Sequence, residues 1–244
     1  MKKYLLIAAI LCVPIAAFGW GIGLIGSGGG GESSGCDSGV EICDDFSGDL
    51  SNWTVLTGSW DIASGELDAD TGGDNKIVYN SPLSSTSGWA LVKITANAAT
   101  SSQGFIFRVE DLTCSANKYN YQSYWYPDTD TFQYFATEYN CGNDCSTSYV
   151  ETFDHEVGGY AGMMWEGTGA NTKVWRFAWD AASGDPGPGP WNKTTGGDYR
   201  TSWEAGFCNS HYADTGLYVG FSVWISSGDP GDMYDNFEAG TYTP

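Results

Sequence analysis

Aromatic side chains are the residues of this sequence whose spacing is best suited to chemistry with a ligand. In a strand, the segment 119–126 (Tyr-Asn-Tyr-Gln-Ser-Tyr-Trp-Tyr) places Trp125 on one face and Tyr124 and Tyr126 on the other. Flat aromatic rings stack on the apolar faces of sugar rings, while nearby amides and carboxylates bind the hydroxyl groups. Because a Pro-Asp turn follows at once, we expect Trp125, Tyr126 and Tyr124 to contact a ligand near a loop.

A second aromatic row lies in the segment 173–179, where Trp175, Phe177 and Trp179 share one face of a strand. Two interpretations stay open. A sandwich buries one face of every strand, which favours the core for this row as a whole. In the alternative, the same rings stack on a sugar, so Trp175 and Trp179 are also candidates for ligand binding.

Acidic residues dominate the charge of the chain, with 30 Asp and Glu against 10 Lys and Arg. A surface of this sign repels phosphate backbones and anionic membranes, so nucleic acid is not expected as a partner. The excess of carboxylates serves solubility or, in the sharper interpretation, binds divalent cations.

The first 19 residues have the features of a signal peptide: Lys2 and Lys3, an apolar stretch at 5–15, and a small-x-small cleavage site ending at Gly19. The uncharged run continues to Gly26, so an uncleaved segment would be long enough to anchor the chain in a bilayer. Its proline and glycines favour cleavage. Residues 20–40 then form a Gly/Ser-rich linker before a domain at 41–244. We expect export to the extracellular space or cell surface, with the periplasm as an alternative and membrane contact only through an uncleaved segment.

Six of the seven cysteines follow the signal peptide, and an even number in an exported chain predicts disulfides. Short intervening loops favour two local pairs and leave one long-range pair, so the expected pairs are Cys36–Cys43, Cys141–Cys145 and Cys114–Cys208. The Cys141–Cys145 spacing also suits zinc. No second close pair accompanies it and the chain has only two histidines, so zinc is not favoured.

Alternating apolar residues predict strands throughout the domain. The segments 90–96, 105–109 and 217–225 have a period of two, and no segment shows a convincing helical period. Gly, Asp and Pro turns separate these runs, and the Pro/Gly-rich segment 181–200 has no strand pattern. The sequence therefore predicts an all-β fold, a single antiparallel β-sandwich of jelly-roll type.

Both ends of the domain resemble the concanavalin A-like jelly-roll superfamily, which includes laminin G-like and glucanase-like domains. The opening segment 44–67, with Asp-Asp-Phe-Ser-Gly-Asp-Leu, Trp, Gly-Ser-Trp-Asp-Ile and Gly-Glu-Leu, resembles the entry strands of such domains. The closing segment 216–237, with Gly-Leu-Tyr-Val-Gly-Phe and Tyr-Asp-Asn-Phe, is similar to their final strands. The resemblance covers most of the domain and implies the fold. It implies no single activity, because lectins, adhesion modules and hydrolases share this fold.

The resemblance also implies where catalytic groups would lie. Endoglucanase-like members carry Glu-x-Asp-x-x-Glu on one strand, with carboxylates that act as nucleophile and general acid. The nearest match is Glu66-Leu-Asp68-Ala-Asp70, which lacks the final glutamate. We interpret it, like the acidic segment 153–156, as a solvated loop. The sequence contains no complete catalytic motif, and no catalytic residue is assigned.

A structural calcium ion is a further implication of the resemblance. In that family the ion often binds the aspartate of the closing motif together with groups near the first strand, which are Asp235 and Asp45 in this sequence.

These observations favour a secreted or surface-tethered module that binds a polysaccharide or another surface glycan through aromatic stacking and polar loops. Two alternatives remain: a glycoside hydrolase of the same fold, and a non-catalytic adhesive or structural surface protein. A hydrolase requires two carboxyl groups in one cleft, whereas a glycan-binding module requires exposed aromatic rings.

Overall fold

The computed structural model describes residues 36–69, 72–96, 102–113, 119–126, 131–138, 145–150, 156–168, 171–193, 199–204, 215–225 and 233–244. The expected signal peptide and most of the expected linker lie outside this part of the chain. Among the described residues, no helix has the length and apolar character needed to span a membrane.

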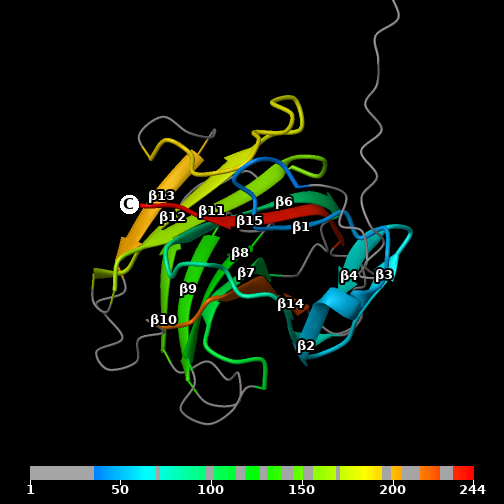
Figure 1. Ribbon diagram of the computed structural model, residues 1–244, viewed down its shortest axis with the longest axis horizontal. Helices are drawn as coiled ribbons and strands as arrows, with labels where there is room; N and C mark the ends of the chain where they lie inside the picture. The colour runs from blue at the N-terminus through cyan, green and yellow to red at the C-terminus, as the bar shows by residue number, and fades with distance from the viewer. Residues whose placement is uncertain are drawn as a thin grey trace, which may run out of the picture. The chain divides into compact units, whose positions relative to one another are not determined.

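Two antiparallel sheets form a sandwich (Figure 1). Sheet A has eight strands in the order β13-β12-β11-β6-β15-β4-β3, with β1 paired to β15. Its strands are β1 (Ile42–Asp44), β3 (Trp60–Ala63), β4 (Glu66–Ala69), β6 (Gly88–Ala96), β11 (Tyr160–Glu166), β12 (Lys173–Trp179), β13 (Tyr199–Glu204) and β15 (Met233–Thr241). The N-terminal strand β1 and the C-terminal strand β15 are therefore neighbours, although the whole domain separates them in the sequence.

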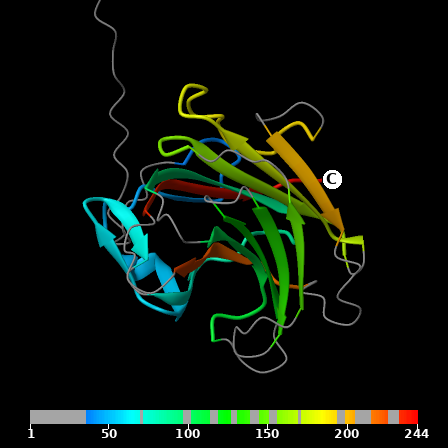
Figure 2. The same cartoon turned by 180° about the vertical axis from the view of Figure 1, so that it is seen from behind.

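Sheet B has seven strands in the order β10-β9-β8-β7-β14-β5-β2 (Figure 2). Its strands are β2 (Trp53–Thr57), β5 (Gly73–Tyr79), β7 (Ser102–Val109), β8 (Tyr119–Tyr126), β9 (Thr131–Glu138), β10 (Cys145–Val150) and β14 (Tyr218–Ile225). A short 3-10 turn, η1 (Leu50–Asn52), precedes β2. This architecture confirms the all-β sandwich that the period-two pattern predicts.

The core between the sheets is strongly aromatic and centres on Phe221 of β14. Its ring lies 4.9 Å from that of Tyr234, 5.0 Å from that of Phe237 and 5.7 Å from that of Trp53. Val219, Phe221, Val223 and Ile225 alternate along β14, and all four are buried in this core. Burial of one side of each strand explains why this stretch of β-branched and aromatic residues folds as a strand.

The alternation leaves a second set of side chains on the outer face of each sheet. On sheet A this outer set is a buried aromatic cluster that includes Trp89, Tyr160, Phe177 and Trp179. On sheet B it is a small apolar cluster of Val78, Ile106 and Val109 at one end.

Two expectations about loops are wrong. Glu66 and Asp68 belong to strand β4, where Leu67 and Ala69 alternate with them and are buried in the core. A two-residue turn with positive φ at Ser64 and Gly65 joins β3 to β4 and fixes this pairing. Strand β13 begins at residue 199, inside the segment 181–200 that shows no strand pattern, because it pairs with β12 over six residues.

Candidate functional site

The aromatic residues predicted to bind ligand lie on different sheets. Tyr124, Trp125 and Tyr126 end strand β8 of sheet B, whereas Trp175 and Trp179 belong to β12 of sheet A. The two groups therefore cannot contribute to one site on one face of the molecule.

On sheet B, the outer face carries two cross-strand rows of polar and aromatic residues. Because Val223 and Ile225 point into the core, Ser222 and Trp224 point outward. Trp224 pairs with Asp74 of β5 on one side and with Ser102 of β7 on the other. Cross-strand partners lie about 5 Å apart, so Trp224 and Asp74 are direct neighbours.

Trp224 is one of the few large apolar side chains exposed among the described residues, with 47% of its surface accessible. Beside it, the side chains of Asp74 and Lys76 form an ion pair with an Nζ to Oδ2 distance of 2.5 Å. The Lys76 side chain is fully buried, whereas that of Asp74 is 36% exposed. Burial lowers the pKa of Lys76, and the Asp74 carboxylate opposes part of this shift. The pair therefore holds an accessible carboxylate next to an accessible indole ring.

The backbone pairing between strands extends these two cross-strand rows from β14 through β7 to β8. Gly104 of β7 pairs with both Ser222 and Tyr124, and Gln103 pairs with both Val223 and Trp125. The register thus brings the backbone of the predicted ligand residues to within two strands of Trp224, while their side chains lie outside the described part of the chain. We name Asp74, Lys76, Ser222 and Trp224 the sheet B site.

The sequence pattern contains a signal for Trp224, although no motif of the chain includes this residue. The period-two run 217–225 has its apolar residues at odd positions, and Trp224 is a large aromatic residue at an even, outward position. An aromatic residue on the polar face of a strand is the feature that distinguishes a candidate ligand contact from the core.

On sheet A, the row of Trp175, Phe177 and Trp179 is covered by the irregular segment that follows β12. Phe177 and Trp179 are buried and Trp175 is half-buried. Trp191 places its ring 5.2 Å from that of Phe177 and 5.0 Å from that of Trp179. Phe177 and Trp179 are therefore buried, but in a cluster on the outer face of sheet A and not between the sheets, where the core interpretation places this row.

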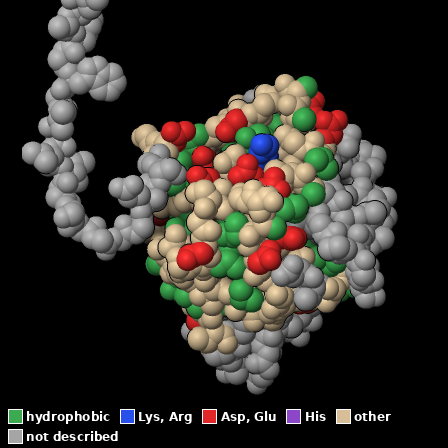
Figure 3. All heavy atoms as spheres, turned by 90° about the vertical axis from the view of Figure 1, so that its right-hand side faces the viewer, with side chains coloured by type: hydrophobic (Ala, Val, Ile, Leu, Met, Phe, Trp, Pro, Cys, Tyr) green, Lys and Arg blue, Asp and Glu red, His purple; other side chains and the backbone are tan. Residues whose placement is uncertain are grey.

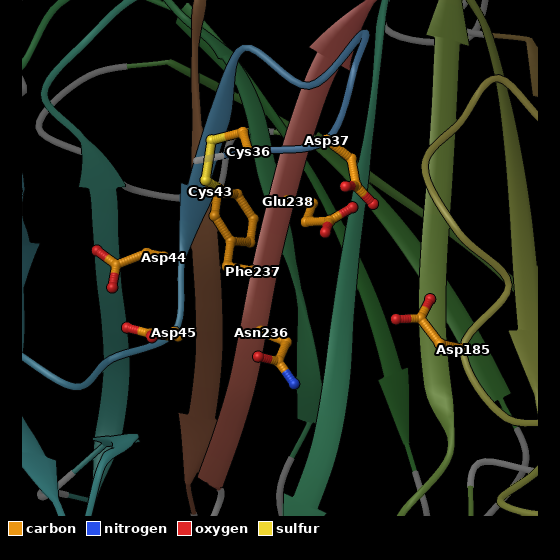
Figure 4. A pocket seen from close by; sticks show the side chains of 9 residues that line it. All are labelled: Cys36, Asp37, Cys43, Asp44, Asp45, Asp185, Asn236, Phe237 and Glu238. Atoms are coloured by element: carbon orange, nitrogen blue, oxygen red, sulfur yellow. A yellow bond between two sulfur atoms is a disulfide. The ribbon is translucent and has the colours of Figure 1, made fainter. Parts of the chain in front are cut away.

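An acidic pocket of about 250 Å³ lies where the first and last strands meet. Carboxylates line most of it, and the lining residues are Cys36, Asp37, Cys43, Asp44, Asp45, Asp185, Asn236, Phe237 and Glu238 (Figure 4). Cys36 and Cys43 form the disulfide expected from their short spacing. The other two expected pairs, Cys114–Cys208 and Cys141–Cys145, stay predictions, because Cys114, Cys141 and Cys208 lie outside the described residues.

The pocket includes only one of the two expected calcium ligands. Asp45 accepts hydrogen bonds from the amide and hydroxyl of Ser47, which lower its pKa. Asp235 does not line the pocket and instead lies 3.8 Å from the ammonium of Lys93. Within the described ranges, no three His, Cys, Asp or Glu side chains are arranged to hold a metal ion. Backbone carbonyl groups also bind calcium, so the calcium site at Asp45 and Asp235 stays a prediction.

Glu238 is the residue of the pocket whose pKa responds to its acidic neighbours. In Figure 4 the side chains of Asp37 and Glu238 lie close together, whereas those of Asp44 and Asp45 point away from them. Burial, followed by the charges of Asp185 and Asp37, raises the pKa of Glu238. On the face of the molecule seen in Figure 3, Asp and Glu side chains are spread over the surface with very little Lys or Arg between them.

With this geometry, the fold can be placed among known structures. A structure described by the phrase "Prominent members of the human gut microbiota express endo-acting O-glycanases to initiate mucin breakdown" matches with a TM-score of 0.50 and 10% identity, over 84% of this chain and all of that one. A β-glucanase of Bacillus licheniformis matches with a TM-score of 0.49 and 9% identity, over 84% of this chain and all of that one. The exoplasmic domain of VIP36, in a form bound to Ca²⁺ and Man3GlcNAc, matches with a TM-score of 0.48 and 8% identity, over 80% and 87% of the two chains.

The chain has the concanavalin A-like jelly-roll fold, as its entry and closing motifs imply. No protein-family model matches the sequence, and no curated protein matches it. At these identities the likeness concerns the fold alone, so the function has to be argued from the residues of this chain.

Proposed function

We propose that this protein is an exported glycan-binding module and that the sheet B site is its binding surface. The observation that carries the proposal is the exposed ring of Trp224 next to the accessible carboxylate of Asp74. A tryptophan face stacks on the apolar side of a pyranose, and a carboxylate accepts hydrogen bonds from its hydroxyl groups.

The ion pair beneath the surface supports this role. Lys76 is fully buried and directs its ammonium at Asp74, so the carboxylate is held in place before a ligand arrives. Preorganised polar groups lose less entropy on binding than mobile ones. Tyr124 and Tyr126 extend the proposed site along β8, because Gly104 pairs with both Tyr124 and the outward Ser222, whereas Trp125 alternates with these two residues.

The test is a glycan array probed with the chain 20–244, which is the protein after cleavage of the expected signal peptide, with and without a chelator, using wild type, Trp224→Ala and the control Val157→Ala. Val157 is also exposed, at 54%, but it precedes β11 of sheet A. We expect binding by wild type and Val157→Ala, and signals at least about fivefold lower for Trp224→Ala, because truncation of an aromatic anchor costs more than about 1 kcal/mol. Absence of wild-type binding to every glycan would refute the proposal. Loss of binding only in the chelator arm would assign a role to calcium.

Hydrolysis of a glycan is the second candidate function, and the acidic pocket favours it. Glycosidases use a carboxyl group with a raised pKa as general acid and a second carboxyl group nearby as its partner. Glu238, with its raised pKa next to Asp185 and Asp37, would be the acid. Release of reducing sugar by wild type and a loss of at least about 100-fold in Glu238→Gln would support hydrolysis. Equal rates for the two proteins would exclude Glu238 as the acid.

The compartment is also part of the proposal. The Cys36–Cys43 disulfide supports export, because disulfides persist in oxidising compartments. We propose cleavage after Gly19, so that residues 20–40 link the domain to its new N-terminus. Mass spectrometry of the protein recovered from the medium should show a chain that begins at Trp20, whereas a membrane-retained chain that begins at Met1 would indicate an anchor.

A further inference from the structure

Side chains from a single segment of the chain contact each of the three aromatic rings of β12, which belong to Trp175, Phe177 and Trp179. This segment, residues 180–193, is named the strap; it follows β12 and contains no strand. The ammonium of Lys193 lies 4.2 Å from the ring centre of Trp175. Trp191 covers the other two rings, with its centre 5.2 Å from Phe177 and 5.0 Å from Trp179. Every ring of the row is therefore in contact with a strap side chain.

The rings under the strap form a continuous aromatic row along β12. Phe177 and Trp179 are stacked on each other, with an angle of 12° between their planes and centres 5.7 Å apart. Trp175, two residues before Phe177 on the same strand, extends this row along β12. A row of rings on one face of a strand suits a linear chain of sugar rings better than a single compact ligand.

Side chains at the C-terminal end of the strap hold it on sheet A. Trp191 donates its backbone N–H to the sulfur of Met164 at 3.3 Å, and its indole N–H bonds back to Gly187 within the strap at 3.1 Å. Lys193 also pairs with Glu166 and lies 5.3 Å from the ring centre of Tyr242. Both Lys193 and Trp175 are half-buried, so this contact is reachable from solvent.

The other end of the strap contains an unfavourable electrostatic contact. Asp185 lines the acidic pocket together with Glu238 and Asp37, and Tyr160 of β11 is its hydrogen-bonding partner. Lys93 of β6, which lies opposite Tyr160 in the register, pairs with Asp235. Like charges at one end and removable side-chain contacts at the other favour a segment that can leave the sheet as a unit.

We propose that the β12 row is a second glycan-binding site and that the strap occupies it as an intramolecular competitor. The ligand class is a linear saccharide whose rings present apolar faces to Trp175, Phe177 and Trp179. Ligand and strap exclude each other because they use the same ring surfaces. This inference goes beyond the proposed function, since it concerns the opposite sheet and does not depend on Trp224.

The experiment compares variants that remove the competitor, made in the Trp224→Ala background so that the sheet B site does not contribute. The same glycan array is probed with two proteins. One is the single variant Trp224→Ala, and the other is the triple variant Trp191→Ala/Lys193→Ala/Trp224→Ala. We expect at least tenfold stronger binding to one or more linear glycans after removal of the two strap side chains, and its loss when Trp175→Ala is added. Signals no higher than those of Trp224→Ala on every glycan would overturn the proposal.

A milder variant keeps the result interpretable if loss of Trp191 unfolds the domain, which thermal unfolding would reveal. Lys193→Ala/Trp224→Ala uncovers Trp175 without changing a buried ring. It should bind the same class of glycan more strongly than Trp224→Ala, by about threefold or more. An unchanged signal in this folded variant would count against the strap as a competitor. Failure of the sheet B site would appear separately, as equal binding by wild type and Trp224→Ala.

Discussion

The outer faces of the two sheets carry aromatic residues in opposite situations. On sheet A, Trp89 and Phe177 are fully buried because the strap packs over them. On sheet B, Trp224 is almost half exposed, and its cross-strand neighbour Asp74 reaches solvent. The residue types are similar, but one face has become a second core and the other remains a surface.

The difference shows that strand alternation alone does not separate structural from functional aromatic residues. Alternation decides which side chains leave the inter-sheet core, and it sends Trp89 and Trp224 to outer faces alike. Whether an outward ring is buried then depends on the irregular segment that covers it. The two faces should consequently respond to mutation in opposite ways, with stability affected on sheet A and binding on sheet B.

The largest effect on stability is expected from Trp89→Ala. Trp89 has no exposed surface, and its ring lies 5.6 Å from that of Trp191. Loss of such a buried ring leaves a cavity and lowers the free energy of unfolding by about 3–5 kcal/mol. Denaturant unfolding measures this loss, and Trp224→Ala is the matched control, with an expected change below about 1 kcal/mol. Similar losses for both variants would remove the distinction between the faces.

Much of the fold was predictable, because local patterns carry it. The runs 90–96, 105–109 and 217–225 correspond to β6, β7 and β14, and the entry and closing motifs imply the jelly roll that the structure has. These patterns reflect burial of every second residue, which each strand satisfies by itself.

The candidate site was predictable only in part, because it depends on contacts between distant segments. Nothing in the sequence places Tyr124 and Trp175 on different sheets, since that follows from strand order. The cover over Trp179 comes from Trp191, beyond a stretch rich in proline and glycine that has no periodic pattern. Likewise, alternation does not reveal the bulge in β15 between Asp235 and Glu238, next to which Asp235 pairs with Lys93 of β6.

Gly162→Ala examines how tightly the strap is packed. A Cβ atom at Gly162 would lie 2.7 Å from the ring of Trp179 and 3.0 Å from that of Trp191. Because both rings are confined, the new methyl group should lower the free energy of unfolding by about 1–3 kcal/mol. Gly48→Ala is the control, since a Cβ atom there meets nothing within 4 Å. A neutral Gly162→Ala, measured by denaturant unfolding, would mean that the strap moves away at little cost.

Lys193→Ala should have a smaller effect on stability. Its ammonium lies over Trp175 and pairs with Glu166, and all three side chains are only partly buried. Partly exposed ion pairs and cation–π contacts contribute about 0.5–1 kcal/mol each, and salt weakens the ion pair. The expected loss is therefore about 1 kcal/mol at low ionic strength and less at about 1 M salt, where charges are strongly screened. A loss that does not depend on salt would assign the contact to the ring alone.

The smallest effect, and the only favourable one, is expected from Glu238→Gln at the acidic end of the strap. Burial and the charges of Asp185 and Asp37 raise the pKa of Glu238 in the folded protein. The folded state then binds the proton more tightly than the unfolded state, so wild-type stability falls as the pH rises from the ordinary glutamate pKa through the raised one. Glu238→Gln has no group that titrates at this position, so its stability does not decrease in this way. It should be slightly more stable than wild type at neutral pH, by less than about 1 kcal/mol because the side chain is only partly buried.

Thermal unfolding of both proteins between acidic and neutral pH measures this difference, and Glu41→Gln is a control with the opposite sign. Although burial opposes it, hydrogen bonds from Thr241 and Ser84 lower the pKa of Glu41, so its ionised form favours folding. Glu41→Gln should therefore lower the Tm at neutral pH, and the two melting temperatures should converge as the pH falls below the ordinary glutamate pKa. If Glu238→Gln also lowered the Tm at neutral pH, the like-charge contact would not be a weak point of the strap, and the contrast between its two ends would be wrong.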